Sequence, residues 1–320
     1  MIEDFWKYID DSKHILIVSH VNPDGDTLGS SLALYSVLKE EGKKVYLYNA
    51  TKVLPVIYDF LPNIDKVKST LPKKFDLVVS CDCADFSRLK IEKGEYRLIN
   101  IDHHQSNDYF GDLNIVDDTK SSVGEIMYEI ISSRYDNLSK ETATCLYTSI
   151  VEDSGFFRYT RVNQKTFEIA SKLVSCGISP SEISFKLKGR QSLAKVRLLG
   201  YIYNNFELLY DAKIAYVYLS REVFEKTGAR VDDTKNLAAN LLDIVNVEVS
   251  VMILKKSDGT FKVSIRSTDD YEISSVASAF GGGGHPNAAG FDAKSDTDVE
   301  ELKREILKQI ENIIKDIDNE

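Results

Sequence analysis

The sequence is poor in cysteine and has no long apolar run, and each shortage narrows the classes of protein it can represent. Only 4 of the 320 residues are cysteines, and no pair of Cys-x-x-Cys knuckles occurs. This favours buried free thiols over a disulfide scaffold or a zinc knuckle. No apolar stretch reaches the length that spans a bilayer, and the first residues lack a basic segment followed by an apolar one. We therefore expect a soluble, cytoplasmic protein with no membrane partner.

The chain also has fewer basic than acidic residues. The chain has 50 acidic residues against 40 basic ones, a formal net charge of -10. Because this overall field does not attract a polyanion, we expect no binding of long nucleic acid through nonspecific phosphate contacts. Short phosphorylated ligands held by local groups remain compatible with it. The length and the 43% apolar content are enough for two globular domains.

Histidine and aspartate gather in short clusters, although the chain has only 5 histidines. The segment His20-Val21-Asn22-Pro23-Asp24-Gly25-Asp26 closes one apolar run, Asp82 closes another, and Asp102-His103-His104 closes a third. Asp153 follows a helical segment. Imidazole and carboxylate ligands gathered in this way suit a pair of hard divalent cations.

The first half of the chain alternates strand-like and helical patterns, which predicts a largely parallel sheet flanked by helices. Strands are expected at 15–19, 44–48, 77–81 and 97–101. Ligands of such sheets gather outside the carboxyl ends of the strands, so the three clusters that follow strands should meet at one edge. Strand alternation also predicts that Cys81 and Cys83 point to one side, away from Asp82.

The second half changes character. Residues 163–206 have mostly helical patterns, and strands are expected at 214–219, 247–254 and 261–266, before an amphipathic helix at 296–317. We therefore divide this α/β protein into a catalytic metal-binding domain, a helical linker and a smaller mixed α/β substrate-binding domain. Their expected bounds are 1–190, 191–210 and 211–320.

A glycine run in the last domain is the other strong signal. Gly281-Gly282-Gly283-Gly284 precedes His285, and consecutive glycines let backbone N–H groups approach a phosphate as an anion-binding loop. Arg266 ends a predicted strand and has the fork geometry for a phosphate or carboxylate.

These motifs resemble the DHH phosphoesterase superfamily with its DHHA1 C-terminal domain, and the resemblance spans nearly the whole chain. It rests on residues 20–30, on Asp102-His103-His104 and on the glycine run. The resemblance implies that His20, Asp24 and Asp82 hold one metal ion, that Asp26, Asp82, His103 and Asp153 hold the other, and that both ions are manganese. It further implies substrate contacts from Arg266, Gly282, Gly283, Gly284 and His285.

A mechanism follows for such a centre. Two divalent cations lower the pKa of a shared water and offset phosphoryl charge, with Asp82 as the bridging ligand. His104 would donate a hydrogen bond or proton to the bridging or leaving oxygen. Asp102 would orient either His103 or His104.

Within the superfamily the chain is most similar to the hydrolases of very short RNA (nanoRNA) and of adenosine 3′,5′-bisphosphate (pAp). A phosphodiesterase of cyclic di-AMP or its linear product pApA is the alternative, and a catalytically silent nucleotide sensor is a third reading. Phe156 and Phe157 are candidates for base stacking, and a homodimer is compatible with the sequence. The chain departs from the family at Glu152, whose charge would disfavour an extra phosphate nearby.

Overall fold

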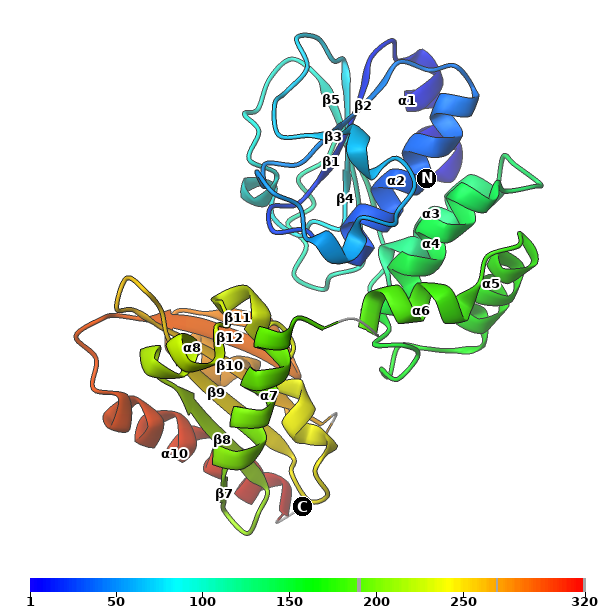
Figure 1. Cartoon of the computed structure of the whole chain (residues 1–320). Helices are drawn as coiled ribbons and strands as arrows, with labels where there is room; N and C mark the ends of the chain where they lie inside the picture. Colours follow the sequence, from blue (N-terminus) through cyan, green and yellow to red (C-terminus); the bar gives the residue numbers. More distant parts are fainter. Residues whose placement is uncertain (189–190, 269, 319–320) are drawn as a thin grey trace. The chain divides into compact units, whose positions relative to one another are not determined.

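The computed structural model describes residues 1–188, 191–268 and 270–318 (Figure 1). The chain forms two compact units, residues 1–190 and 191–320. Each unit has its own six-stranded sheet and its own hydrophobic core. No described helix is long and apolar enough to cross a membrane.

The sheet of the first unit is parallel throughout, with strand order β3-β2-β1-β4-β5-β6. This confirms the predicted parallel sheet and adds β3 and β6, which the sequence did not predict. The chain passes from β1 outward to β3, and from β4 outward to β6, so the direction of winding reverses between β1 and β4. The strands are β1 (Ile15–Ser19), β2 (Val45–Tyr48), β3 (Val67–Lys68), β4 (Leu77–Cys81), β5 (Arg97–Asp102) and β6 (Leu113–Val116).

Buried helices cover one face of this sheet. The α2 helix has almost no exposed residue before its last turn and packs closely against α4. The 3-10 turns η1 (Val56–Tyr58), η2 (Ile64–Lys66) and η3 (Phe86–Leu89) lie in the connections between strands. The helices are α1 (Ile2–Asp11), α2 (Gly25–Glu40), α3 (Val123–Ser132), α4 (Lys140–Asp153), α5 (Gln164–Ser175) and α6 (Pro180–Lys188).

The two sheet faces have separate cores because strand side chains alternate. Ile17 and Val79 belong to the core shared with the helices, whereas Leu16 belongs to a smaller core on the opposite face. Cys81 joins the first core and Cys83 the second. The prediction that these two thiols share a side was therefore wrong, because the residue between them leaves the extended conformation and ends the alternation.

The second unit has a mixed sheet with strand order β11-β12-β10-β9-β8-β7, in which only β8 and β9 pair in parallel among the described strands. Its strands are β7 (Glu207–Leu209), β8 (Ile214–Leu219), β9 (Val249–Lys255), β10 (Phe261–Ser267), β11 (Gly283–His285) and β12 (Ala288–Ala293). This confirms the predicted mixed α/β architecture of the second half.

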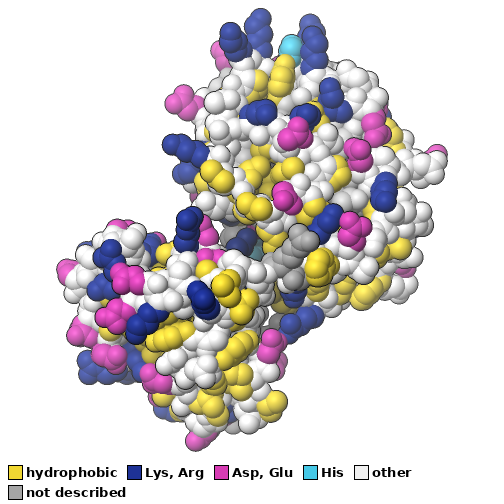
Figure 2. Space-filling view, viewed as in Figure 1, with side chains coloured by type: hydrophobic (Ala, Val, Ile, Leu, Met, Phe, Trp, Pro, Cys, Tyr) yellow, Lys and Arg dark blue, Asp and Glu magenta, His cyan; other side chains and the backbone are white. Residues whose placement is uncertain are grey.

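Two helices cover opposite faces of this sheet. The α10 helix packs Leu302, Ile306 and Ile310 into the core on one face, and α7 packs Leu198 and Ile202 on the other. The helical elements are α7 (Leu193–Asn205), α8 (Arg221–Thr227), η4 (Val231–Thr234), η5 (Ala239–Asp243), α9 (Ser274–Ala279) and α10 (Val299–Asp318). On the face shown in Figure 2, acidic and basic side chains are interspersed on the surface of both units.

Candidate metal centre

Three predicted segments meet at the carboxyl edge of the first sheet. His20 follows β1, Asp82 follows β4 and Asp102 ends β5. These strands are direct neighbours, β1 pairing with β4 and β4 with β5. The winding of the sheet reverses between β1 and β4, and ligands of open α/β sheets collect at that position.

The first group of possible ligands consists of His20, Asp24 and Asp82. His20 Nε2 lies 3.6 Å from Asp24 Oδ2 and 3.4 Å from Asp82 Oδ2. His20 Nδ1 lies 2.9 Å from the Val21 carbonyl, and in the neutral tautomer that donates to it, the ring presents the Nε2 lone pair to the carboxylates. Ligand atoms about 2.1 Å from an octahedral cation lie about 3 Å apart. The observed spacing is therefore close to that of a cation shell.

The second group consists of Asp26, His103 and Asp153. His103 Nε2 lies 3.2 Å from Asp153 Oδ2 and 3.7 Å from Asp26 Oδ2. His103 Nδ1 donates to the Lys120 carbonyl at 3.2 Å, which fixes the ring as the Val21 carbonyl fixes His20.

Asp82 lies between the two groups. Its Oδ2 faces His20, while its Oδ1 lies 3.7 Å from His103 Nε2 and 3.6 Å from His104 Nδ1. The backbone of Asp82 is left-handed, with φ of 59°, an uncommon conformation for a residue with a side chain. This turn ends the strand and directs one carboxylate toward both groups.

Residues of α3 and α4 hold the Asp26 carboxylate in place. Its carboxylate accepts the backbone N–H groups of Val123 at 2.8 Å and Gly124 at 3.1 Å, and the hydroxyl of Ser149 at 2.5 Å. A helix N-terminus stabilises such a negative charge. A Cβ on Gly124 would lie 2.0 Å from Ser149 Oγ, so this contact requires glycine. The sequence did not reveal this support.

The Asp102 carboxylate bonds the imidazole ring of His104, whereas its interaction with His103 is with the backbone. Its Oδ1 accepts the Nδ1 proton of His104 at 2.7 Å, and its Oδ2 accepts the amide of Asn107 at 2.5 Å. Burial raises the pKa of Asp102, but the hydrogen bonds from His104 and Asn107 outweigh it and lower the pKa below its ordinary value. The question of which histidine Asp102 orients is thereby answered.

The charges of the cluster favour a bound cation. Burial lowers the pKa of His20, but the hydrogen bonds and charges of Asp24 and Asp82 outweigh it and raise the pKa to about 10. Burial likewise lowers the pKa of His103, and Asp153, Asp26 and Asp82 together raise it to about 10. Burial, with the charges of Asp82 and Asp153, raises the pKa of Asp26 well above its ordinary value. The donor set, imidazole nitrogen with carboxylate oxygen and no thiolate, fits hard divalent cations.

One basic residue near the centre was not predicted. Arg88 Nη2 lies 3.1 Å from His20 Nδ1, and the Arg88 carbonyl accepts the backbone N–H of Val21 at 3.0 Å. The η3 turn that carries Arg88 directly follows the Asp82 segment. In the sequence, the only feature that connects Arg88 with the centre is its short distance along the chain from Asp82.

The predicted substrate residues of the second unit lie along one row of its sheet. Arg266 pairs with Ala288 across β10 and β12, and Ala288 pairs with His285 across β12 and β11. Directly paired residues share a face, so Arg266 and His285 flank Ala288 about 10 Å apart. Arg266 also lines a cavity of about 460 Å³ together with Lys235 and Lys262.

The second half of the glycine run is a strand, whereas Gly281 and Gly282 lie in the turn before it. Gly283–His285 is the edge strand β11. A Cβ on Gly282 would lie 2.3 Å from the Gly290 carbonyl, and one on Gly284 would lie 2.4 Å from the Ala288 carbonyl. The glycines thus permit close backbone approach, which is a structural reason for the run besides any contact with a phosphate.

Phe156 and Phe157 both have left-handed backbone conformations and pack against the core of the first unit. The Phe157 ring stacks on Phe167, with centroids 5.2 Å apart, and Lys188 Nζ lies 4.0 Å from the centroid of the Phe156 ring. These rings therefore already have partners within the chain.

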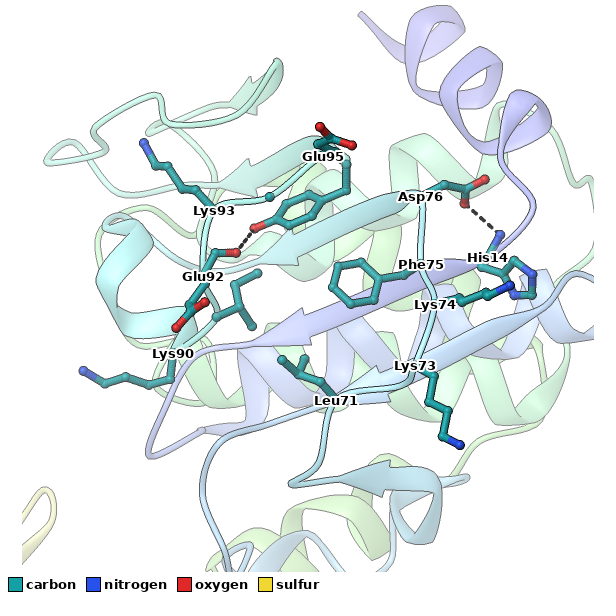
Figure 3. A pocket seen from close by; sticks show the side chains of 13 residues that line it. His14, Leu71, Lys73, Lys74, Phe75, Asp76, Lys90, Glu92, Lys93 and Glu95 are labelled. Atoms are coloured by element: carbon teal, nitrogen blue, oxygen red, sulfur yellow. Dashed lines mark hydrogen bonds between the residues drawn. The ribbon is translucent and has the colours of Figure 1, made fainter.

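A larger cavity, of about 810 Å³, lies at the opposite edge of the first sheet (Figure 3). His14, Asp76 and Tyr96 line it, and these residues directly precede β1, β4 and β5. Tyr96 donates to the Glu92 carbonyl at 2.6 Å across this region. The described residues that line it include none of the predicted site residues, so this cavity is separate from the metal-binding edge.

Comparison with known proteins agrees with this geometry. The model of the DHH family, N-terminal domain, matches residues 14–150, and that of the DHHA1 domain matches residues 211–316. The bifunctional oligoribonuclease and PAP phosphatase NrnA of Thermus thermophilus is 30% identical over 298 residues, which cover 92% of this chain and 89% of that protein. The protein of the same name from Bacillus subtilis is 30% identical over 281 residues, or 86% and 88% of the two chains. The crystal structure of an exopolyphosphatase-related protein from Bacteroides fragilis has a TM-score of 0.90 and 28% identity, and covers 97% of this chain and 95% of that one.

Proposed function

Because the chain belongs to the DHH family and carries the DHHA1 domain, we propose that it is a phosphoesterase that hydrolyses very short RNA and pAp with two divalent cations. Its relatives from T. thermophilus and B. subtilis are named for both activities. Both reactions break a phosphoester next to a nucleoside with water as acceptor, so one centre can perform either. Manganese suits the mixed imidazole and carboxylate shell.

The position of Asp82 carries this proposal. Its two carboxylate oxygens face different groups of ligands, His20 on one side and His103 on the other. His20, Asp24 and Asp82 would hold one cation, and Asp26, Asp82, His103 and Asp153 the other. When bound, the pair supplies Lewis acidity that lowers the pKa of water and offsets phosphoryl charge.

His104 is the proton donor in this proposal. Burial lowers its pKa, but the hydrogen bond to Asp102 and the charge of Asp82 outweigh that effect and raise the pKa. The ring is therefore more protonated near neutral pH than an ordinary histidine, which suits proton donation to a leaving oxygen. Asp102 keeps its Nδ1 proton in place, so that Nε2 would face the substrate.

The second unit supplies phosphate contacts. Arg266 and His285 would bind a terminal phosphate from one face of the sheet, with Lys235 and Lys262 at the cavity beside them. These local cations explain how a chain with a net charge of -10 can bind a short anionic substrate. The backbone of Gly282, Gly283 and Gly284 would complete the contact.

A substrate panel tests the proposal. Initial rates with Mn²⁺ are compared for pAp, RNA dinucleotides to pentanucleotides, pApA and cyclic di-AMP. We expect pAp and the short RNAs to be hydrolysed fastest, and much faster turnover of cyclic di-AMP would contradict the assignment. The Asp82→Ala variant should lose hydrolysis while the second unit still binds nucleotide. If the protein is a catalytically silent sensor, the wild type itself will show no hydrolysis.

A further inference from the structure

Tyr58 connects two segments that carry predicted ligands. Its side chain is 2% exposed, and its hydroxyl donates to Glu152 Oε1 at 2.6 Å. The backbone of Gly25 also acts on this hydroxyl and partly offsets the rise in the Tyr58 pKa. Gly25 lies between Asp24 and Asp26, and Glu152 directly precedes Asp153.

Glu152 lies directly against the backbone at the start of α2. A Cβ on Gly25 would lie 2.0 Å from Glu152 Oε2 and 3.0 Å from its Cδ. Glu152 Oε2 is buried, and Oε1 accepts the bond from Tyr58. The carboxylate is thus engaged inside the protein, whereas the sequence had suggested that it would repel a substrate phosphate.

The environment keeps Tyr58 a hydrogen-bond donor. Burial, followed by the charge and hydrogen bond of Glu152 and the charge of Asp24, holds the pKa of Tyr58 far above its ordinary value. The hydroxyl therefore remains protonated near neutral pH.

We propose that Tyr58 and Glu152 are positioning residues that hold Asp24, Gly25 and Asp26, at the start of α2, at a fixed distance from the end of α4. This inference rests on the two-cation function proposed above. Asp24 belongs to the His20 group, while Asp26 and Asp153 belong to the His103 group, so the contact sets the spacing between the two groups.

Loss of the contact should act mainly on the His20 group. Asp26 has separate support from α3 and Ser149. The Asp24 side chain caps α2 by accepting the backbone N–H of Thr27 at 3.2 Å, but it is 32% exposed, whereas the Asp26 side chain is buried. Without Tyr58 and Glu152, Asp24 would therefore move more freely than Asp26.

Tyr58→Phe removes one hydroxyl and tests this role. Mn²⁺ binding is followed through the electron paramagnetic resonance signal of free Mn²⁺, and unfolding is measured in the presence of chelator. We expect binding at one of two sites to weaken roughly tenfold, as on loss of an outer hydrogen-bond partner of a metal ligand. At saturating Mn²⁺ the kcat should stay near that of the wild type.

Tyr96→Phe is the matched control. Its hydroxyl also donates at 2.6 Å, to the Glu92 carbonyl beside the cavity at the far edge of the sheet (Figure 3). It should leave Mn²⁺ binding unchanged. The unfolding midpoint of Tyr58→Phe in the presence of chelator shows whether the variant remains folded, which separates a positioning role from a loss of the fold.

Variants of Glu152 test the partner. Glu152→Gln keeps an acceptor for Tyr58 and should weaken Mn²⁺ binding less than Glu152→Ala. Adding Tyr58→Phe to Glu152→Ala should cause little further loss, because the two side chains act as one unit. These variants decide the matter if Tyr58→Phe does not fold.

The possible results bear on the two proposals in different ways. A Tyr58→Phe variant that binds Mn²⁺ like the wild type overturns the inference, as do losses that add fully in the double variant. A wild-type protein that binds two Mn²⁺ ions and hydrolyses substrate leaves the proposed function standing in either case. A wild-type protein that binds no Mn²⁺ overturns both.

Discussion

His104 donates its Nδ1 proton to Asp102 Oδ1 across 2.7 Å, and the Asp102 side chain is completely buried. The carboxylate lies behind the ring, so its influence on a substrate would pass through His104. Asn107 occupies its other oxygen. The two neighbouring histidines thus have different surroundings, since His103 faces the carboxylates of Asp26 and Asp153 and His104 bonds Asp102.

Asp102→Asn should alter the pH profile of hydrolysis. The hydrogen bond to Asp102 raises the pKa of His104, so the substitution should lower that pKa. A general acid acts while protonated, and activity falls as pH rises through its pKa. The descending limb of kcat should therefore move to lower pH, and kcat should fall by about 10²-fold. Exposed Asp108→Asn is the control, and an unmoved limb would argue against His104 as the acid.

Mn²⁺ binding should tighten as pH rises and should release protons. His20 and His103 each have a pKa of about 10 when no cation is bound. Near pH 7 both rings are therefore protonated, and a cation must displace a proton from each, about two in total. Titration calorimetry in buffers of different ionisation enthalpy measures this release. Binding that does not vary between pH 6 and pH 9 would contradict the assignment of these ligands.

Gly29→Ala should destabilise the first unit. A Cβ there would lie 2.5 Å from the Cys145 carbonyl and 3.0 Å from the Ser149 backbone nitrogen, so α2 and α4 would have to separate. Overpacking of this kind costs about 1–3 kcal/mol. Gly200→Ala in α7 meets nothing within 4 Å and should be neutral or slightly stabilising. Scanning calorimetry measures the unfolding temperatures of the two variants. Equal temperatures would contradict the close contact between α2 and α4.

Arg266→Ala should weaken substrate binding more than it slows the chemical step. An arginine that contacts a phosphate away from the reacting bond contributes equally to the ground state and the transition state. We expect KM for pAp to rise about tenfold, with kcat nearly unchanged. The control is Arg304→Ala, which removes an exposed arginine on α10 at the other face of the sheet. A fall in kcat with no change in KM would show that Arg266 acts on the chemical step and not on substrate binding.

Long buried strands were the most predictable part of the fold. The structure gives β1, β4 and β8 the bounds expected from the sequence, because each is an apolar run buried along nearly its whole length. The meeting of His20 and Asp82 also followed from sequence, since parallel strands place their carboxyl ends at one edge. Short strands such as β3 and β6 carry too few residues for a pattern and depend on pairing with their neighbours.

Support for the ligands could not be read from the sequence. The bond between Asp26 and Val123 joins residues 97 positions apart, and that between Tyr58 and Glu152 joins residues 94 apart. Neither pair has a local pattern. The left-handed turn at Asp82 and the edge strand in the glycine run are likewise set by tertiary contacts, and both replaced a simpler local expectation.

Crystals grown with Mn²⁺ and measured at the manganese absorption edge test the central claim most directly. We predict two anomalous peaks about 3.5–4 Å apart, one touching Asp82 and His20 and the other touching Asp82 and His103. A single peak, or a second peak out of reach of the Asp82 carboxylate, would contradict a centre built around this residue.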